Sequence, residues 1–320
     1  MTLLHGVIYG AAILSVFLTA VGMGLWFERK FAARMQSRLG PTMVGPSGLL
    51  QPLADVLKLL QKEDIAPARA DKFLFELAPP LAALCAIGAA AVIPFSPGIV
   101  GADIDVGVLF LLAIGALTVL PIFAAGWGSN NKFALLGGMR AIAQSIAYEV
   151  PLLMAAMVPV ILAGSMSLGR IVEFQRSHHW LVVWPFFLGI PAFLLFLLAM
   201  LAESNRIPFD IPEAESELVA GVTTEYTGMK FALFYVTEYV HTMVASAAAA
   251  ALFLGGWDGP FAPGLHWMVL KTLTMFAVVY WIRWTLLRFR ADQLMHLCWS
   301  YLVPAGFVLV AGAAAFVTFT

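Results

Sequence analysis

The chain has 320 residues, of which 61% are hydrophobic and 12% are charged, and its mean hydropathy is +0.90. Soluble domains typically carry about 25% charged residues, so this composition excludes a soluble globular protein and indicates an integral membrane protein. The 18 basic and 19 acidic side chains give a net charge of −1, which excludes the basic excess typical of a nucleic-acid-binding protein.

Apolar runs of about 20 residues, the length that crosses the hydrocarbon core of a bilayer, recur along the sequence. Because backbone exposed to lipid must satisfy its own hydrogen bonds, each run predicts an α-helix. We therefore predict an all-α integral membrane protein with eight transmembrane helices in a single membrane domain, 1–320. The eight runs lie near 7–27, 77–95, 106–125, 141–163, 181–202, 231–254, 265–287 and 299–319.

The distribution of Lys and Arg predicts the orientation of these helices. Most basic residues lie in the connections 28–72, 127–140, 203–230 and 288–298, whereas the opposite side holds only Arg170 and Arg176. Cytoplasmic loops are enriched in basic residues, so we expect these connections inside and both termini outside. Alanine-rich stretches such as ASAAAAAL point to a bacterial gene. The predicted location is the bacterial inner membrane, crossed several times, with both termini periplasmic.

The first connection, 28–72, contains a short amphipathic segment, LLQPLADVLKLLQKED. Gln51, Asp55, Lys58 and Lys62 recur at helical spacing, and leucine and valine fill the other face. The segment is too short to span a bilayer, and this pattern is typical of a helix that lies in the membrane interface. The alternative is an ordinary amphipathic helix packed on its neighbours.

Three carboxylates are predicted within the helices or at their ends. Glu149 and Glu238 lie about 12 Å and about 10 Å from the cytoplasmic ends of their spans at 1.5 Å per residue, and Glu203 ends another span. A charge at such depth is costly unless it is paired, hydrated or protonated, so each is a candidate functional residue. We expect the three side chains to converge in the cytoplasmic half of the bundle. The alternative is a structural role, such as a pair between Glu238 and His241.

Other ionisable residues lie near the outer side of the predicted bundle. Lys271 lies within a span near its outer end, and we expect its amine to extend toward the membrane surface. His178 and His179 lie in an outer connection, where a solvated pair is expected. We assign a chemical role to none of these three.

The fifth connection, 203–230, is acidic although the flanking spans are apolar. Its motif AESNRIPFDIPEAESELVAG contains Glu203, Asp210, Glu213, Glu215 and Glu217. Charge runs usually face water, so a solvated acidic surface is the simple interpretation. A lining for a site that handles charge is the other interpretation, and the residues alone leave both open.

The sequence contains no motif for a bound redox cofactor or metal. Cys85 and Cys298 are far apart and belong to no CxxC or Cys/His pattern. No GxGxxG motif follows a strand-like run. We therefore expect this chain to bind no flavin, iron–sulfur cluster or metal, and any redox cofactor to come from a partner.

Four long motifs identify a resemblance that covers almost the whole chain. They are ERKFAARMQSRLGPTMVGPSGLLQPLADVLKLLQKED, GWGSNNKFALLGGMRAIAQSIAYEVP, AESNRIPFDIPEAESELVAGVTTEYTGMKFALFYVTEY and RFRADQLMHLCW. They resemble the H-subunit (subunit 1) family of proton-pumping NADH:quinone oxidoreductase, respiratory complex I. The resemblance implies a membrane subunit of a translocase that acts on quinone, carries no redox cofactor itself, and contacts other membrane-arm and peripheral-arm subunits and the lipid bilayer.

The resemblance also implies roles for individual residues. In this family the two long cytoplasmic connections form the membrane side of the quinone chamber. Residues that would line or brace the chamber are Arg29, Arg34, Lys58 and Glu63. Residues that would form a mobile acidic loop are Arg206, Asp210, Glu213, Glu215, Glu217 and Glu225. Glu149, Glu203 and Glu238 match carboxylates at the start of a proton path.

Two other functions remain open at this point. A related membrane subunit of a membrane-bound hydrogenase or formate hydrogenlyase shares ancestry with this family, but the intact first connection and the RFRADQLM segment favour the quinone enzyme. A stand-alone proton or cation transporter would also use buried carboxylates. The sequence shows no inverted repeat or matched pair of broken helices, which such transporters often contain.

Overall fold

The structure, a computed structural model, describes residues 3–213 and 215–319. Helices dominate it, and a short antiparallel pair, β1 (Pro94–Ser96) and β2 (Ile99–Val100), forms its only sheet in the described part. Six helical segments there are long and apolar enough to cross a membrane. They are Lys72–Ala90, Gly107–Gly128, Lys132–Ala163, Gly228–Phe253, Leu265–Thr285 and Ala291–Phe319.

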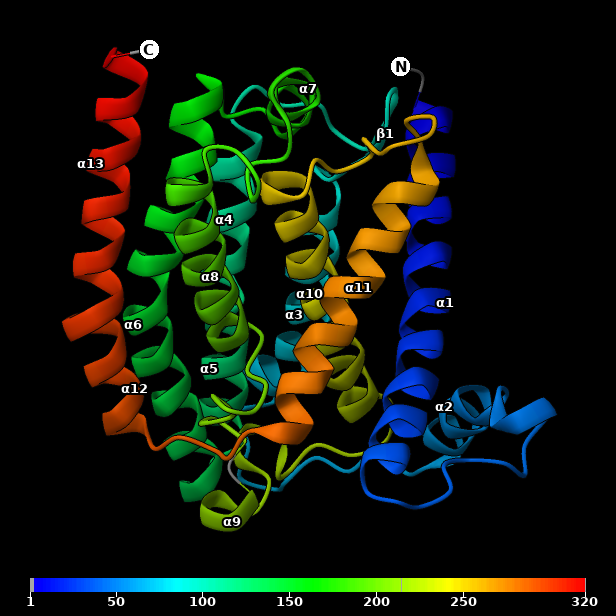
Figure 1. The fold of residues 1–320 in the computed structure, drawn as a ribbon. Helices are drawn as coiled ribbons and strands as arrows, with labels where there is room; N and C mark the ends of the chain where they lie inside the picture. The colour runs from blue at the N-terminus through cyan, green and yellow to red at the C-terminus, as the bar shows by residue number, and fades with distance from the viewer. Residues whose placement is uncertain (1–2, 214, 320) are drawn as a thin grey trace.

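The helices run roughly side by side in one bundle (Figure 1). Those in the first half are α1 (Leu3–Met35), α2 (Gln51–Gln61), α3 (Lys72–Ala90), α4 (Gly107–Leu117), α5 (Val119–Gly128) and α6 (Lys132–Ala163). Those in the second half are α7 (Leu168–His178), α8 (Phe186–Glu203), α9 (Glu215–Leu218), α10 (Gly228–Phe253), α11 (Leu265–Thr285), α12 (Ala291–Leu297) and α13 (Val303–Phe319). Short 3₁₀ turns, η1 (Pro46–Gly48) and η2 (Gly221–Thr223), and a π-helical turn, η3 (Cys298–Leu302), complete the order.

Six of the eight predicted spans correspond to these six segments. The remaining two correspond to α1, with 33 residues, and to α8, with 18 residues. Both run along the bundle, and the two termini lie at one end while α2 and α9 lie at the other (Figure 1). The prediction of a helical membrane protein is confirmed at this level, and the exact number of eight crossings stays a prediction.

Several helix boundaries differ from the predicted ones for local reasons. α1 continues to Met35, beyond the predicted end at 27, so Glu28 and Arg29 are helical. The predicted span 106–125 is divided at Thr118, whose hydroxyl donates to the Gly115 carbonyl at 2.6 Å. α6 begins at Lys132, before 141, because the Asn131 side chain caps it by accepting from the Phe133 N–H. The outer helix α7 was not predicted.

The centre of the bundle is formed by α6 and α10. α6 packs against α5, α8 and α13, and α10 packs against α3 and α11. The outer half of α10 is a run of buried small residues that includes Ala245, Ser246 and Ala249. Small residues let helix backbones approach closely, which places the polar residues Glu238 and His241 of α10 among neighbouring helices.

Lys271 corrects one expectation from the sequence. Only 7% of its surface is exposed, which shows that its side chain does not extend into the medium outside the bundle. The ammonium donates to the carbonyl oxygens of Leu254, Gly256 and Asp258 at 2.5, 3.0 and 2.5 Å, and lies 4.2 Å from the centre of the Trp180 ring. The last carbonyls of a helix have no partner within the helix, and here a side chain from α11 supplies one at the end of α10.

Candidate functional site

The acidic connection is folded against the bundle at its beginning. Gln144 of α6 is buried, and its side-chain amide donates to the carbonyls of Ala202 and Phe209 at 2.7 and 2.8 Å. The N–H of Phe289, in the α11–α12 connection, donates to the Pro208 carbonyl at 2.9 Å. The rings of Phe209 and Phe289 stack with centres 5.7 Å apart. The segment that follows α8 is therefore held from two sides.

This folding carries Arg206 into the protein interior. Its side chain is 1% exposed, and Nη1 lies 2.8 Å from the Glu238 carboxylate of α10. The guanidinium also lies 4.5 Å from the centre of the Tyr239 ring, an arrangement that stabilises a cation. A buried ion pair is stable only when both charges stay paired, so Arg206 fixes the acidic connection to α10.

A second buried ion pair lies beside the first. Glu28 of α1 accepts from Arg283 of α11 at 2.7 Å, and the Tyr239 hydroxyl also donates to the Glu28 carboxylate. Glu28, Arg283 and Tyr239 are not among the site residues predicted from the sequence. Glu28 lay just outside the predicted first span, and only the continuation of α1 to Met35 shows that it faces the bundle.

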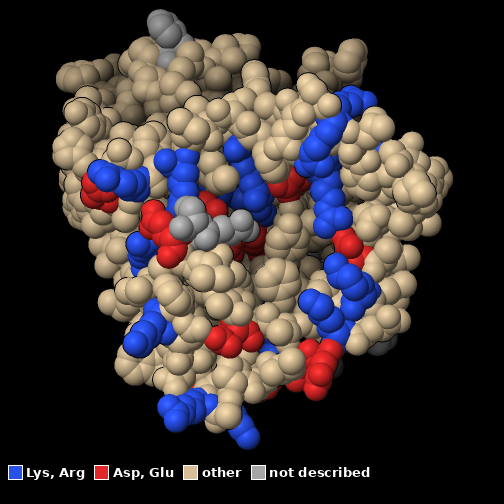
Figure 2. All heavy atoms as spheres, turned by 90° about the horizontal axis from the view of Figure 1, so that it is seen from below, with Lys and Arg blue, Asp and Glu red and all other residues tan. Residues whose placement is uncertain are grey.

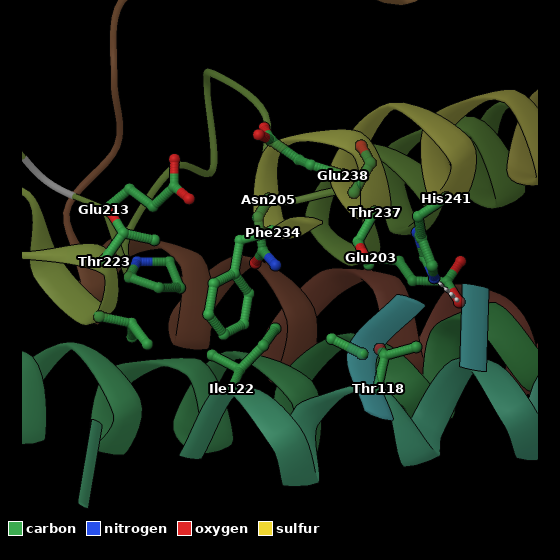
Figure 3. A pocket seen from close by; sticks show the side chains of 14 residues that line it. Thr118, Ile122, Glu203, Asn205, Glu213, Thr223, Phe234, Thr237, Glu238 and His241 are labelled. Atoms are coloured by element: carbon green, nitrogen blue, oxygen red, sulfur yellow. Dashed lines mark ion pairs between the residues drawn. The ribbon is translucent and has the colours of Figure 1, made fainter. Parts of the chain in front are cut away.

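Between these groups and α5 lies a cavity of about 70 Å³, here called the carboxylate cavity (Figure 3). Glu203, Glu213 and Glu238 all line it, together with His241. Pockets for organic ligands usually measure about 300–1,000 Å³. The carboxylate cavity is smaller than this range and is of a size for water molecules. The other lining residues are Ala82, Thr118, Ile122, Ser204, Asn205, Pro212, Val222, Thr223, Phe234 and Thr237.

Glu203 contacts His241 across this cavity, as the dashed line in Figure 3 shows. Nε2 of His241 lies 3.7 Å from Oε1 of Glu203, and each side chain is 11% exposed. The alternative drawn from the sequence paired His241 with Glu238, whereas the contact seen in the structure is with Glu203. Gly115 of α4 gives the Glu203 carboxylate its space, because a Cβ at this position would lie 2.4 Å from Oε1.

Glu149 lies near the carboxylate cavity without lining it. It accepts a hydrogen bond from the Ser145 hydroxyl one turn earlier in α6, and it is close enough to Glu203 for their charges to interact. The three carboxylates predicted from the sequence therefore lie in one region, with Glu203 and Glu238 at the cavity and Glu149 behind it.

Glu213 is the residue of the acidic connection that reaches the cavity. Burial raises the pKa of Glu213 well above its ordinary value, and the carboxylates of Glu238 and Asp210 raise it further. Arg206 and Arg283 act in the opposite direction with smaller effect. Glu213 thus links the acidic connection to the buried ion pairs electrostatically.

The other predicted members of the acidic loop have different environments. Glu217 lies on the surface 2.5 Å from Arg140, and the hydrogen bond from Arg140 lowers the pKa of Glu217. Glu225 accepts from the Asn131 side chain at 2.5 Å. The backbone of Glu215 lies in α9, but its side chain is outside the described residues. Glu217 and Glu225 do not line the cavity that Glu213 reaches.

The predicted residues of the first connection lie away from the carboxylate cavity. Arg29 pairs with Asp55 of α2 at 2.6 Å, and Lys58 lies 3.8 Å from the same carboxylate. Arg34 and Glu63 are exposed. Charged side chains of both signs gather on this end of the bundle (Figure 2), so these four predicted chamber residues lie at or near a surface, whereas Arg206 of the acidic connection is buried.

Comparison with known proteins identifies the family. The profile of a family described as NADH dehydrogenase matches residues 8–314. A protein of Geobacter metallireducens, named as an H subunit of NADH-quinone oxidoreductase, is 47% identical over 313 residues, which are 94% of each chain. This chain belongs to the H-subunit family.

Other members of the H-subunit family agree over similar lengths. The H subunit of Brevibacillus brevis is 46% identical over 323 residues, which cover 99% of this chain and 95% of the relative. That of Dehalococcoides mccartyi is 45% identical over 302 residues, which cover 94% and 84%. The resemblance inferred from the four motifs is confirmed.

Within the described residues, no group of three or more His, Cys, Asp or Glu is placed to hold a metal ion.

Proposed function

We propose that this chain is the membrane subunit of a proton-pumping NADH:quinone oxidoreductase, that it forms the membrane side of the quinone chamber, and that it couples quinone reduction to proton translocation through buried carboxylates. The family membership carries this proposal. The buried charge cluster of Arg206, Glu238, Glu28 and Arg283 supports the coupling role, because charges inside a membrane protein are costly and mark ion or proton pathways.

The quinone chamber in this proposal lies between this chain and a partner subunit. The carboxylate cavity is smaller than the pockets that usually hold organic ligands, whereas the surface near α2 presents Arg29, Arg34, Lys58 and Glu63. A peripheral-arm partner that supplies the terminal redox centre would close the chamber over this surface. The chain itself would bind quinone as a shared substrate and no flavin, iron–sulfur cluster or metal.

The coupling follows from the chemistry of the reaction. Reduction of a quinone to a quinol takes up two electrons and two protons, so negative charge develops in the chamber before protonation is complete. Asp210 and Glu213 lie on the connection that faces the chamber, and Glu213 interacts electrostatically with Glu238. A change in charge at the connection would therefore act on Glu238, then on Glu203 across the cavity, and then on Glu149.

The proposed location is the bacterial inner membrane with α2 and the acidic connection on the cytoplasmic side. The termini share the opposite end of the bundle (Figure 1), which is the arrangement that an even number of crossings gives. The excess of Lys and Arg on the connections near α2 supports the cytoplasmic assignment.

Purification of the tagged chain from its own membranes tests this function. We expect other complex I subunits to co-purify and the preparation to catalyse NADH:quinone reduction that piericidin- or rotenone-type inhibitors block. Co-purification with hydrogenase subunits and no quinone dependence would favour the hydrogenase alternative. Purification of the chain alone, with transport activity in liposomes, would favour a stand-alone transporter.

A further inference from the structure

Two internal cavities meet at a single pair of side chains. The carboxylate cavity and a deeper cavity of about 20 Å³ share only Glu203 and His241 among their lining residues. The other residues around the deep cavity are apolar or glycine, and include Leu111, Phe196 and Val244. The Glu203–His241 pair therefore separates a polar cavity that reaches the acidic connection from an apolar one that lies farther inside the bundle.

The position of His241 suits the transfer of a proton between these sides. It follows Glu238 by three residues on α10, so the two side chains lie on one face of the helix about 4.5 Å apart along its axis. Imidazole is unusual among side chains because one ring nitrogen can accept a proton while the other releases one. The 3.7 Å between Nε2 and Glu203 Oε1 is slightly longer than a hydrogen bond, and a small side-chain rotation would close it.

We propose that His241 carries protons between the Glu238 side of the carboxylate cavity and Glu203, and that the Glu203–His241 pair controls access to the deep cavity. This deepens the proposed coupling function and rests on it. A proton bound by the imidazole forms an imidazolium. Its transfer breaks the Nε2–H bond and forms an O–H bond on Glu203, which leaves a neutral imidazole and a neutral carboxyl group. No electron moves in this step.

The surroundings of the pair favour a transfer over a fixed charge. The titratable groups that face it are Glu238 on its own helix, Glu213 on the acidic connection, and Glu149 and Tyr148 on α6. None of these four groups carries a permanent positive charge that would hold Glu203 ionised. When the pair holds this proton, no net charge borders the apolar cavity. Loss of the proton leaves a negative charge on Glu203 beside that cavity.

His241→Gln tests the proposal because glutamine can hydrogen-bond but cannot carry a proton at neutral pH. The assembled complex in proteoliposomes would be assayed for NADH:quinone reduction and for protons translocated per NADH oxidised. A positioned proton carrier typically contributes about 10²–10⁴-fold to a proton-transfer step, so we expect translocation to fall by about tenfold or more while reduction of an artificial acceptor is unchanged. His266→Gln, at an exposed outer histidine, is the matched control.

Two further variants keep the test decisive if His241→Gln does not assemble. Gly115→Ala leaves His241 intact but displaces the Glu203 carboxylate, so it should cause the same loss of translocation. His241→Ala should recover translocation when imidazole is added, which a purely structural role for His241 would not allow.

Where His241→Gln does assemble, its effect on translocation and that of Glu203→Gln should be non-additive, because two residues that act as one unit lose that function only once.

The outcomes separate this inference from the proposed function. If the wild-type complex shows no NADH:quinone reduction, the proposed function is wrong. If Glu203→Gln impairs translocation while His241→Gln and Gly115→Ala pump at the wild-type ratio, the function stands and the role of His241 is wrong.

Discussion

At the scale of single residues, burial separates the charges that matter from those that do not. Arg206 and Glu217 belong to one acidic connection, yet the first is buried against Glu238 and the second lies on the surface beside Arg140. Removing one partner of a buried ion pair usually costs about 3–5 kcal/mol. Exposed ion pairs contribute about 0–1 kcal/mol. Residues that are equivalent in the sequence motif are therefore not equivalent in the molecule.

The first prediction follows from this difference. Arg206→Ala should strongly reduce quinone reductase activity and the thermal stability of the complex, because it leaves the Glu238 carboxylate buried without its cation. Glu217→Ala should be nearly silent. Quinone reductase rates and melting curves of both variants would be compared, with reduction of an artificial acceptor as the assembly control. Equal effects of the two substitutions would show that the connection acts as a uniform solvated surface.

The second prediction concerns pH and Glu213. Because the pKa of Glu213 is raised in the folded protein, its contribution to stability is present below the ordinary Glu pKa and is lost as pH rises through the raised value. Above that range the folded protein holds an unfavourable charge. Glu213→Gln should therefore stabilise the complex at neutral and alkaline pH and have little effect at acidic pH. Melting temperatures across this range provide the measurement, and a variant curve parallel to the wild-type curve would contradict the prediction.

At the scale of elements, helix existence followed from hydropathy, but helix ends and partners did not. The apolar runs predict six of the segments because burial in lipid requires about 20 apolar residues. The break at Thr118, the extension of α1 and the outer helix α7 depend on local hydrogen bonds and packing that no hydropathy window contains. For the same reason, the position of Glu238 within an apolar helix was predictable, while its pairing with Arg206 and the pair of Glu28 with Arg283 were not.

The third prediction concerns the end of α10. Lys271→Met keeps much of the side chain's length but leaves the carbonyls of Leu254, Gly256 and Asp258 without their shared donor. Each buried polar group left unsatisfied costs about 1–3 kcal/mol, so we expect a clear loss of thermal stability with little direct effect on quinone chemistry. Lys132→Met, at an exposed lysine, is the control. A Lys271→Met protein as stable as wild type would show that the carbonyls find other partners.

The fourth prediction concerns α2, which lies beside α1 at the edge of the bundle (Figure 1). Three of its leucines, Leu53, Leu57 and Leu60, are each more than half exposed. A spin label at Leu57→Cys should collide more with oxygen, which dissolves in lipid, than with a water-soluble nickel complex. A label at Lys58→Cys should show the opposite preference. Both labels preferring nickel would exclude the interfacial position.

At the scale of the whole molecule, the buried carboxylates of the site gather toward one end of the bundle. The ion pairs of Arg206 and Glu28, the carboxylate cavity and the charged surface near α2 all belong to the end opposite the termini (Figures 1 and 2). The other end holds α7, the β1–β2 pair and the Lys271 contacts. From this asymmetry we expect that a charge change at the end near α2 is transmitted only to residues inside the chain. Protons would then leave through neighbouring subunits.

The fifth prediction tests the orientation of that asymmetry. In a background with Cys85→Ser and Cys298→Ser, a membrane-impermeant thiol reagent should label Ser177→Cys, in the last turn of α7, in intact cells. Ser216→Cys, in the acidic connection, should be labelled only after the membrane is permeabilised. Labelling of Ser216→Cys from outside would overturn the assignment of this connection to the cytoplasm.

The pair of Glu28 and Arg283 links the first helix to one of the last, and this affects biosynthesis. Arg283 follows Glu28 by 255 residues, which a ribosome adding about 5–20 residues per second translates in roughly 13–51 s. During this interval Glu28 lacks its Arg283 partner, and an unpaired charge within hydrocarbon is costly, so we expect Glu28 to remain at the membrane surface. We therefore expect the first helix to reach its final depth only after α11 has been inserted. A nascent chain that stalls before α11 lacks Arg283, the partner of Glu28. We expect membrane proteases that remove incomplete proteins to recognise such a chain.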